Sequence, residues 1–413
     1  ERERNFAKIN QINRLIRDLG NNGFQDGVMR QAALLAYDPN FLTNLDENIY
    51  LLGFTNGVYD FEADIFRDGC PDDYISLSTN YNYIPFNAKD ENAVSILKFF
   101  KEIQPDKQMR RYLLVLLSTT IAGSICEESM YVMTGAGSNG KSKLFELLKA
   151  ALGDLFKTMD VQVLVGKRPS SSSATPEIAD KKGVRACTFD EPKARDEINA
   201  GFMKLFTSDT ITARGLFQEP IYFKPQFKPF LLCNRLPKIS EDDDGTWRRI
   251  KVIPFPSRFW KKSDAPKKYL KKGYPPGNFE ADLSLSDKMK EWKQMFMAIL
   301  VEYYRIYKSE SLVHPELVTR TTSDYRRTCD IYQDFIGDYL EKSGDKTVLS
   351  IKSLHENMGT WFRSNHQVKA PSAKELRNYI AQRLTVNYDA KKDVLVGYRY
   401  RVAEDEDDGS AFD

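Results

Sequence analysis

A glycine-rich segment with one lysine has the residue types and spacing that phosphate binding requires. Residues 135–142 match the pattern G-x-x-x-x-G-K-[ST], between an apolar run typical of a strand and a helical pattern. Glycines let backbone N–H groups surround a di- or triphosphate, Lys141 can reach the β- and γ-phosphates, and the Ser142 hydroxyl can bind Mg²⁺. A glycine-rich turn with a surface lysine is the alternative, and it does not account for the flanking strand and helix. The segment predicts an ATP–Mg²⁺ site formed by Gly135, Ala136, Gly137, Ser138, Asn139, Gly140, Lys141 and Ser142.

Two acidic side chains follow a second apolar run. Val184–Phe189 has the composition of a buried strand and is followed by Asp190 and Glu191. Ligands of open α/β sheets bind at the carboxyl ends of the strands. Asp190 is therefore expected in the Mg²⁺ shell, and Glu191 is expected to orient or deprotonate the attacking water. By itself, an apolar run followed by two acidic residues also fits an ordinary strand end. Its place about 50 residues after the phosphate loop favours the catalytic interpretation.

An asparagine ends a third apolar run, Phe230–Cys233. The Asn234 amide at this position can hydrogen-bond the γ-phosphate or the attacking water. Asparagine also caps or turns a chain, which is the alternative interpretation. We include Asn234 among the candidate catalytic residues.

A pair of arginines, Arg248 and Arg249, precedes the apolar run Ile250–Phe255. An arginine here can stabilise charge that develops on the γ-phosphate, in its own subunit or in a neighbouring one. A solvated pair on a strand edge is the alternative. If the segment is extended, the two side chains alternate in direction, so only one can point at the phosphate. The spacing to Ile253 and Phe255 favours Arg249.

The rest of the chain must supply the sheet that brings these residues together. It has 413 residues, with 60 Lys+Arg, 58 Asp+Glu and 41% hydrophobic residues, which excludes a wholly disordered chain and a globally basic DNA-coating protein. No apolar stretch approaches the ~18 residues of a membrane span. Five separated cysteines favour free thiols over a disulfide framework. The histidines are His314, His355 and His366, which argues against metal–histidine catalysis in the first 313 residues.

The order of these motifs resembles superfamily III helicases, the AAA+ helicases of viruses. Met203–Arg214 and Thr175–Arg185 resemble further segments of that family. Leu51–Asp60 is similar to the domain that precedes the helicase in poxvirus-type and other large-DNA-virus helicase-primases. The resemblance covers about residues 46–256. It implies an α/β fold with an AAA+ P-loop core, in which helices flank a mostly parallel sheet, and a hexameric ring that moves along DNA.

The resemblance also implies a DNA-contacting hairpin between the Met203–Arg214 segment and the Asn234 strand, near residues 214–224. A basic residue there can bind phosphate, and an aromatic ring can stack on a base. The Phe217-Gln218 tip departs from the Lys-His or Lys-x-Lys tip of relatives, so a hairpin with merely packed apolar residues is the alternative. The expected DNA contacts are Arg214, Phe217 and Lys224.

The block 326–403 has the pattern of a winged helix. A capping box at Ser372–Glu375 opens its third helix, and residues 389–393 form a wing-like turn between two β-rich runs. Lys374 and Arg377 on that helix and Lys391 in the wing are expected to contact DNA phosphates. The alternative is a winged helix that contacts protein and keeps these charges solvated.

Six segments are expected along the chain. They are an α+β domain at 1–90, a helical collar at 91–125, the helicase core at 126–308, a linker at 309–325, the winged-helix-like domain at 326–403 and an acidic tail at 404–413.

The expected function is that of an ATP-dependent replicative DNA helicase of a DNA virus, acting as a hexamer on single-stranded or forked DNA. Because the chain lacks an initiator Met, we expect it to be part of a longer protein with a covalently linked N-terminal primase region. The expected location is an intracellular reducing compartment, either the host cytoplasm or the nucleus. The alternatives are another AAA+ DNA-remodelling or packaging ATPase, and an ATP-switched DNA-binding initiator or scaffold.

Overall fold

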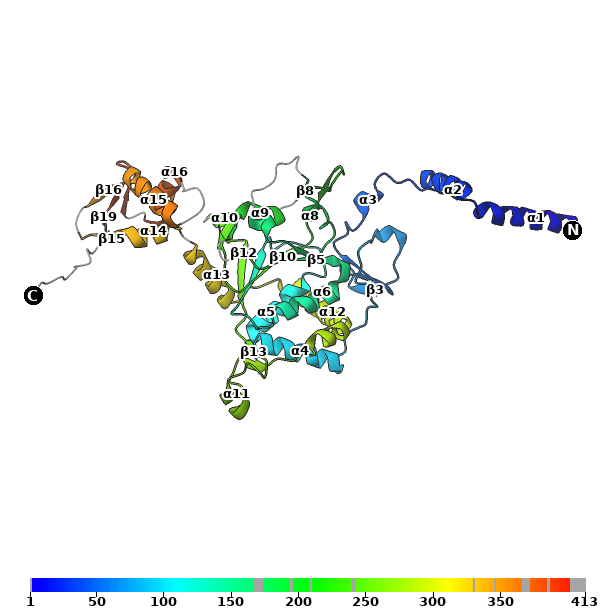
Figure 1. Cartoon of the computed structure of the whole chain (residues 1–413), viewed down its shortest axis with the longest axis horizontal. Helices are drawn as coiled ribbons and strands as arrows, with labels where there is room; N and C mark the ends of the chain where they lie inside the picture. The colour runs from blue at the N-terminus through cyan, green and yellow to red at the C-terminus, as the bar shows by residue number, and fades with distance from the viewer. Residues whose placement is uncertain are drawn as a thin grey trace, which may run out of the picture.

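The computed structural model describes most of the chain, with helices α1 and α2 and the C-terminal unit on opposite sides of a central body (Figure 1). The described residues are 2–165, 174–193, 196–207, 210–239, 243–329, 331–344, 347–365, 372–384 and 387–401. The predicted acidic tail at 404–413 lies outside these ranges. Within them, no helix combines the length and the apolar character needed to cross a bilayer.

A five-stranded parallel sheet forms the centre of the molecule. Along β4, Met130 and Val132 belong to one apolar cluster, whereas Tyr131 and Met133 belong to another. Side chains alternate in direction along a strand, so the sheet is buried on both faces, as in α/β proteins. The predicted fold class is confirmed. In spatial order the strands are β12 (Ile250–Pro254), β4 (Met130–Thr134), β10 (Lys228–Cys233), β6 (Ala186–Phe189) and β5 (Phe156–Met159).

Helices cover both faces of this sheet. The helical collar expected at 91–125 contains α4 and α5, and Gly153 follows the last residue of α6. The larger layer consists of α4 (Glu91–Ile103), α5 (Lys107–Ser118), α6 (Lys141–Leu152) and α12 (Leu285–Glu310). The second layer contains α7 (Gln162–Val165), α8 (Pro176–Ala179), α9 (Ala200–Phe206) and α10 (Asp244–Trp247).

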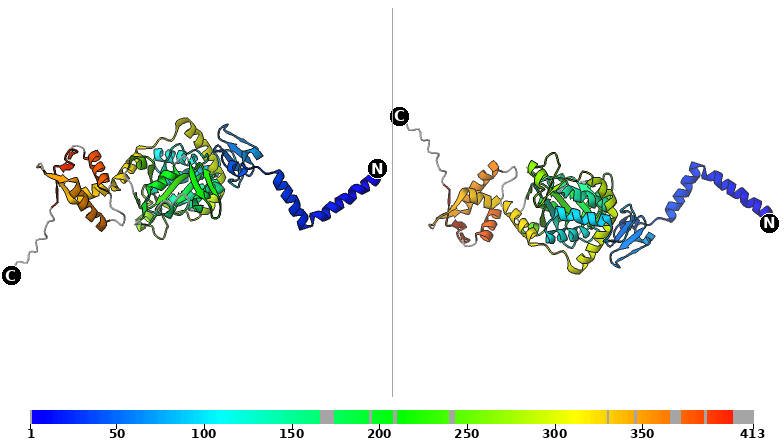
Figure 2. Two further views of the ribbon diagram at one scale, coloured as in Figure 1. Left: turned by 90° about the horizontal axis from the view of Figure 1, so that it is seen from above. Right: turned by 90° about the horizontal axis from the view of Figure 1, so that it is seen from below.

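The N-terminal region combines exposed helices with a small sheet. Helices α1 (Arg2–Leu19) and α2 (Asn22–Leu35) extend away from the core (Figure 2). After the short helix α3 (Phe41–Asn44), strand β1 (Leu51–Phe54) pairs with β2 (Gly57–Asp60) around Asn56-Gly57, a dipeptide that favours tight hairpin turns. Strand β3 (Ile65–Arg67) completes an antiparallel sheet of three strands.

Residues 309–325 are not simply a linker, which corrects the sequence-based expectation. Helix α13 (Glu316–Thr328) occupies most of this range and packs against β12. Val318 and Tyr325 are buried on it, and the Tyr325 hydroxyl donates to the carbonyl oxygen of Pro237. The helix is rich in Thr and Arg and buries only a narrow stripe of side chains. Its composition therefore resembles that of a solvated connection.

Two excursions leave the core. Strands β8 (Ile211–Arg214) and β9 (Pro220–Phe223) form the antiparallel hairpin expected near 214–224. The second excursion contains β13 (Arg258–Trp260), α11 (Lys267–Lys272) and β14 (Asn278–Glu280), with β13 and β14 paired in parallel. A short parallel pair joins β7 (Glu197–Ile198) to β11 (Lys238–Ile239).

The C-terminal unit has its own apolar core. The predicted capping box at Ser372–Glu375 opens α16. Its elements, in chain order, are α14 (Ile331–Tyr339), β15 (Leu340–Lys342), β16 (Val348–Ser350), α15 (Ile351–Asn365), α16 (Ala373–Arg383), β17 (Tyr388–Asp389), β18 (Val394–Val396) and β19 (Tyr398–Tyr400). The third helix and the turn between two strands lie where they were expected, while the winged-helix assignment stays a prediction.

Arg185 joins the N-terminal region to the core sheet. The residue lies directly before β6 and is 2% exposed. Its guanidinium donates hydrogen bonds to the carbonyl oxygens of Ile49, Leu51 and Asn48 at 2.7, 3.1 and 3.2 Å. Burial lowers the pKa of Arg185 to about 10, so the group is still charged at neutral pH. One buried cation thus holds the chain around the start of β1 against the sheet.

We predict that Arg185→Ala lowers the free energy of unfolding by about 3–5 kcal/mol, because the substitution leaves three carbonyl oxygens without this donor. Urea unfolding followed by circular dichroism measures the change. Arg14→Ala is the control, since Arg14 lies on the exposed helix α1 in a weak surface pair with Asp18 and should cost less than about 1 kcal/mol. Equal effects of the two substitutions would contradict this role of Arg185.

Candidate functional site

The loop between β4 and α6 has the backbone conformation that its glycines predict. Gly137, Ser138 and Gly140 have φ angles of 81°, 48° and 87°. Glycine adopts this left-handed region without steric cost. A Cβ on Gly135 would lie 2.6 Å from the carbonyl oxygen of Phe255. The loop leads directly into α6 at Lys141, where the first N–H groups of the helix lack intrahelical acceptors and are available to an anion.

Lys141 is buried at the start of α6, with 5% of its surface exposed. Its ammonium donates to the carbonyl oxygen of Gly135 at 2.9 Å and to Asn234 Oδ1 at 3.2 Å. Burial lowers the pKa of Lys141, and the charge of Glu191 opposes this shift. The ammonium therefore has neutral oxygen acceptors, with an acidic side chain nearby.

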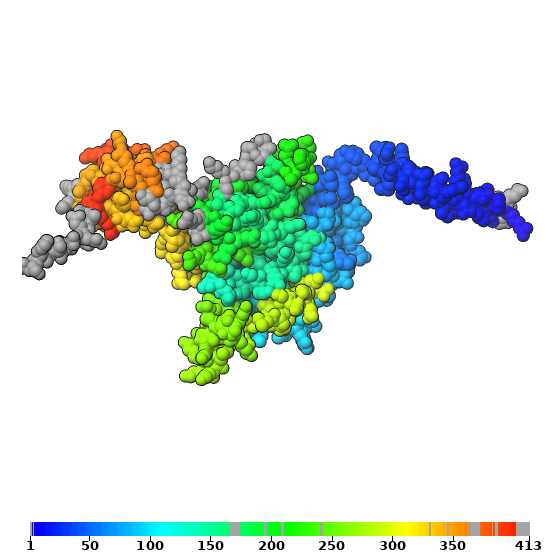
Figure 3. Space-filling model, in the orientation of Figure 1, coloured from blue at the N-terminus to red at the C-terminus, as the bar shows by residue number. Residues whose placement is uncertain are grey.

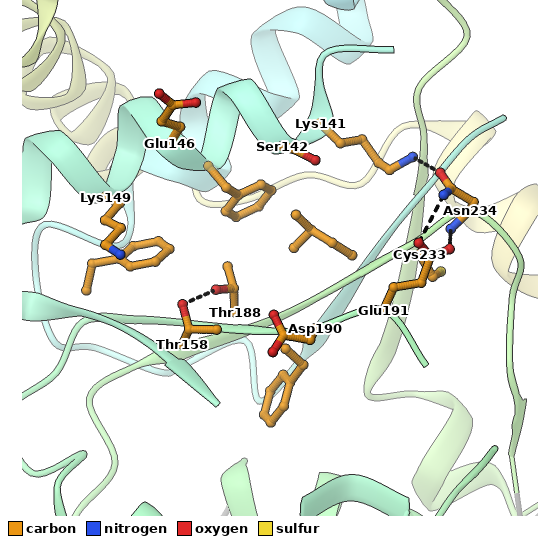
Figure 4. Close-up of a pocket in the computed structure, with 14 residues that line it drawn as sticks. Lys141, Ser142, Glu146, Lys149, Thr158, Thr188, Asp190, Glu191, Cys233 and Asn234 are labelled. Atoms are coloured by element: carbon orange, nitrogen blue, oxygen red, sulfur yellow. Dashed lines mark hydrogen bonds between the residues drawn. The ribbon is translucent and has the colours of Figure 1, made fainter. Parts of the chain in front are cut away.

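Asn234 connects Lys141 to Glu191, as Figure 4 shows. While its Oδ1 accepts from Lys141, its Nδ2 donates to Glu191 Oε2 at 3.0 Å and its backbone N donates to Glu191 Oε1 at 2.8 Å. The order of the strands explains this contact. Because β10 lies between β4 and β6, the residue after β10 lies between the residues that follow the other two strands.

The predicted residues line one open cavity of about 360 Å³. Lys141, Ser142, Asp190, Glu191 and Asn234 all contribute to its wall, from α6 and the carboxyl ends of β6 and β10. The sequence therefore identified side chains that the fold brings together.

The same cavity has polar lining residues that the sequence analysis missed: Glu146, Lys149, Thr158, Thr188 and Cys233. Periodicity could have found some of them. Glu146 and Lys149 follow Ser142 by four and seven positions on α6, and Thr188 precedes Asp190 by two positions on β6. Thr158 and Thr188 lie side by side, with their hydroxyl oxygens 3.3 Å apart.

Ser142 and Asp190 provide the oxygen atoms that suit a hard divalent cation beside phosphate. Both side chains line the cavity, and neither makes a side-chain hydrogen bond to the described residues. No group of three or more His, Cys, Asp or Glu side chains that could hold a metal occurs in the described ranges. A cation here would need ligand oxygens from a bound phosphate as well as these two side chains.

The structure distinguishes the two arginines. Arg249 is tied to its own subunit, since its guanidinium donates to Thr207 Oγ1 at 3.0 Å, to the carbonyl oxygen of Gly245 at 2.7 Å and to Glu128 at 3.3 Å. Arg248 is exposed, and its side chain makes no hydrogen bond or ion pair with the described residues. The sequence-based preference for Arg249 does not fit this geometry, because a guanidinium with three internal partners is not available to a phosphate.

Both arginines lie far from the phosphate loop of their own subunit. The backbone N–H of Met130, the first residue of β4, donates to the carbonyl oxygen of Arg249. The phosphate loop starts only after Thr134, at the other end of β4, which is roughly 13 Å away along the strand. Arg248 and Arg249 therefore belong to the amino edge of the sheet, whereas the cavity belongs to its carboxyl edge.

The residues expected to contact DNA lie outside this cavity. In the β8–β9 hairpin, Phe217 is fully exposed, and Arg214 donates through Nε to the carbonyl oxygen of Gln218 at 2.8 Å. Lys224 is exposed just after β9. The hairpin itself is confirmed, while its contact with DNA stays a prediction.

In the C-terminal unit, Lys374 and Lys391 are exposed. Arg377 instead forms a bidentate pair with Asp393, with both distances 2.8 Å. The Asp393 carboxylate raises the pKa of Arg377 and occupies its guanidinium. Arg377 is therefore less available to a phosphate than the sequence analysis expected.

Comparisons with known proteins agree with the resemblance seen in the sequence. A family model described as "D5 N terminal like" matches residues 2–108. A protein of Acanthamoeba polyphaga mimivirus named "Putative helicase L207/L206" is 59% identical over 395 residues, which covers 95% of this chain and 41% of that protein. "Putative helicase 184R" of Invertebrate iridescent virus 6 is 29% identical over an alignment that covers 88% of this chain and 39% of that protein. "Putative primase C962R" of African swine fever virus is 26% identical over an alignment that covers 89% of this chain and 39% of that protein.

Among solved structures, the apo structure of the NrS-1 C-terminal region aligns with 76% of this chain and 77% of that chain, at 11% identity and a TM-score of 0.46. This chain spans about two-fifths of the length of its viral relatives. Nearly the whole chain aligns with the mimivirus protein. Over most of its length, the chain is therefore similar to viral proteins that carry helicase or primase names.

Proposed function

We propose that this chain is the ATP-hydrolysing motor of a viral DNA helicase. The observation that carries the proposal is the convergence of Lys141, Ser142, Asp190, Glu191 and Asn234 on one cavity at the carboxyl edge of a parallel sheet. Phosphate-binding loops function in this arrangement. The names of the viral relatives support DNA as the substrate.

Each side chain has a distinct role in this proposal. Lys141 exchanges its contacts with Gly135 and Asn234 for the β- and γ-phosphates of ATP. Ser142 and Asp190 would hold Mg²⁺, and its charge would offset the negative charge of the phosphates. Glu191 orients the attacking water and accepts its proton, with its carboxylate positioned by the two donors of Asn234.

A neighbouring subunit completes the site. Arg248 lies at the amino edge of its own sheet, farther from its own phosphate loop than an arginine side chain reaches. It is also exposed and unpaired among the described residues. We therefore assign Arg248, rather than Arg249, as the arginine that approaches the γ-phosphate of the adjacent copy. This assignment supports assembly of a closed ring, for which a hexamer is the number that the family resemblance implies.

DNA passes through this ring in the proposal, and the β8–β9 hairpin contacts it with Phe217 at the exposed tip and Lys224 at its base. The primase name of the African swine fever virus relative supports a primase region linked to the motor in the full-length protein. The proposed place of action is a reducing compartment of the infected host cell, in its cytoplasm or nucleus.

Two substitutions test the assigned chemistry. Lys141→Ala should abolish ATP hydrolysis and weaken nucleotide binding, because the phosphates lose their buried cation. Glu191→Gln should retain nucleotide binding and lower turnover by about 100-fold or more, because the base is lost while the Asp190 carboxylate remains. Phosphate release and binding of a fluorescent ATP analogue measure these effects, with Lys98→Ala on the exposed face of α4 as the control.

Near-normal turnover of Lys141→Ala would refute the phosphate-loop assignment. Strand displacement on a forked duplex distinguishes the helicase from another DNA-remodelling or packaging ATPase. Phosphate release stimulated by single-stranded DNA would eliminate a non-hydrolysing initiator or scaffold.

The shared site can be tested by mixing two inactive proteins. Arg248→Ala should leave stability and ATP binding intact and lower turnover by up to about 1,000-fold. When Lys141→Ala and Arg248→Ala proteins exchange subunits, some interfaces combine an intact phosphate loop with an intact arginine, so hydrolysis should return. Arg249→Ala is the matched comparison, and it should instead lower stability because three internal hydrogen bonds are lost. Free exchange without recovered hydrolysis would refute the shared site.

A further inference from the structure

Residues 258–280, here called the basic arm, carry a strong local charge that the motor site does not use. The arm contains seven Lys or Arg residues and two acidic residues, Asp264 and Glu280, which gives a net charge of +5. The whole chain has a net charge of +2, so the remaining residues together carry −3. The arm is therefore a locally basic segment of a chain whose remaining residues are slightly acidic.

The cations of the arm are open to solvent. The arm projects from the body of the molecule with α11 at its end (Figures 1 and 3). Lys262 pairs with Glu280 at 3.3 Å. The other lysines are exposed and make no ion pair with the residues that the structure describes; they are Lys261, Lys267, Lys268, Lys271 and Lys272. On α11 the pairs Lys267/Lys271 and Lys268/Lys272 are each four positions apart, so these four charges share one side of the helix.

The aromatic residues of the arm are used to stabilise it. The Arg258 guanidinium lies 3.9 Å from the centre of the Trp260 ring, and Trp260 Nε1 donates to Asn278 Oδ1 at 2.9 Å. Tyr269 packs edge-on against Trp260 and contacts Tyr274. These rings are all partly covered, so the arm lacks an exposed aromatic platform on which unpaired bases could stack.

The position of the arm differs from that of the β8–β9 hairpin. The arm follows the carboxyl end of β12, and the backbone N–H of Phe259 donates to the carbonyl oxygen of Ser138 in the phosphate loop. The hairpin instead leads into the amino end of β10. Figure 1 shows α11 and β8 on opposite sides of the core. The two excursions therefore offer separate surfaces.

We propose that the basic arm binds the phosphate backbone of double-stranded DNA, as a second contact outside the DNA path of the motor. A duplex has a higher density of phosphate charge than a single strand, and it requires no base stacking. The exposed lysines that make no ion pair with the described residues provide positive charge for these phosphates. This binding requires neither ATP nor hydrolysis, so it can be measured without the proposed motor activity.

The test compares duplex binding by two variants with equal charge loss. The arm variant carries Lys267→Gln, Lys268→Gln, Lys271→Gln and Lys272→Gln. The control variant carries four substitutions at exposed positions elsewhere: Lys8→Gln, Lys89→Gln, Lys98→Gln and Lys107→Gln. Fluorescence anisotropy with a labelled short duplex, without nucleotide, gives the affinity between about 50 and 200 mM salt. Circular dichroism and DNA-free ATP hydrolysis check that both variants are folded.

The arm variant should lose duplex affinity about tenfold or more at low salt, and the slope of log K against log salt should fall by about two or more, since each lost phosphate contact removes about 0.9. The control variant should change much less. Replacing the same four lysines by arginine should preserve binding, because the positive charge is kept. Equal losses in the arm and control variants would overturn the proposal. An equal loss of affinity for the matching single strand would overturn the assignment to a duplex.

Discussion

The buried ammonium of Lys141 is the interaction on which the arrangement of the site depends. A cation with so little exposure requires oxygen acceptors, and the chain supplies the carbonyl of Gly135 and the amide oxygen of Asn234. The amide oxygen faces Lys141, so the amide nitrogen is directed at Glu191. Because the buried Lys141 ammonium needs oxygen acceptors, the orientation of Asn234 is fixed. Asn234 in turn fixes the position of the Glu191 carboxylate. The strand order, with β10 between β4 and β6, makes this possible.

The acidic strand is constrained at both ends. At its start, Arg185 binds carbonyl oxygens of the N-terminal region, and at its end Glu191 accepts two hydrogen bonds from Asn234. Between them, β6 is buried throughout. The N-terminal region is therefore attached directly to the strand that carries the acidic residues of the site.

Much of the site could be predicted because its signals are local. The spacing from Gly135 to Ser142 fixes a loop and a helix start, and an apolar strand followed by Asp190 places a carboxylate at a sheet edge. What could not be predicted depends on partners distant in sequence. Arg249 is held by Thr207 and Glu128, and Arg377 is held by Asp393, and no periodicity indicates which arginine a fold will pair internally. Likewise, α13 buries little more than Val318 and Tyr325, which is too weak a pattern to separate a packed helix from a linker.

The hydrogen bond from Phe259 to Ser138 has a consequence for how the molecule responds to its ligands. Ser138 has a left-handed backbone conformation in the loop that leads into α6, and the backbone N–H of Phe259, in the strand that starts the basic arm, donates to its carbonyl oxygen. If the loop rearranges around a bound phosphate and moves the Ser138 carbonyl, the hydrogen bond that holds Phe259 at the base of the arm changes as well. Two ligands that each favour one state of the same hydrogen bond alter each other's affinity by an identical factor. If a phosphate in the cavity and DNA on the arm both act on this hydrogen bond, each would change the affinity of the other.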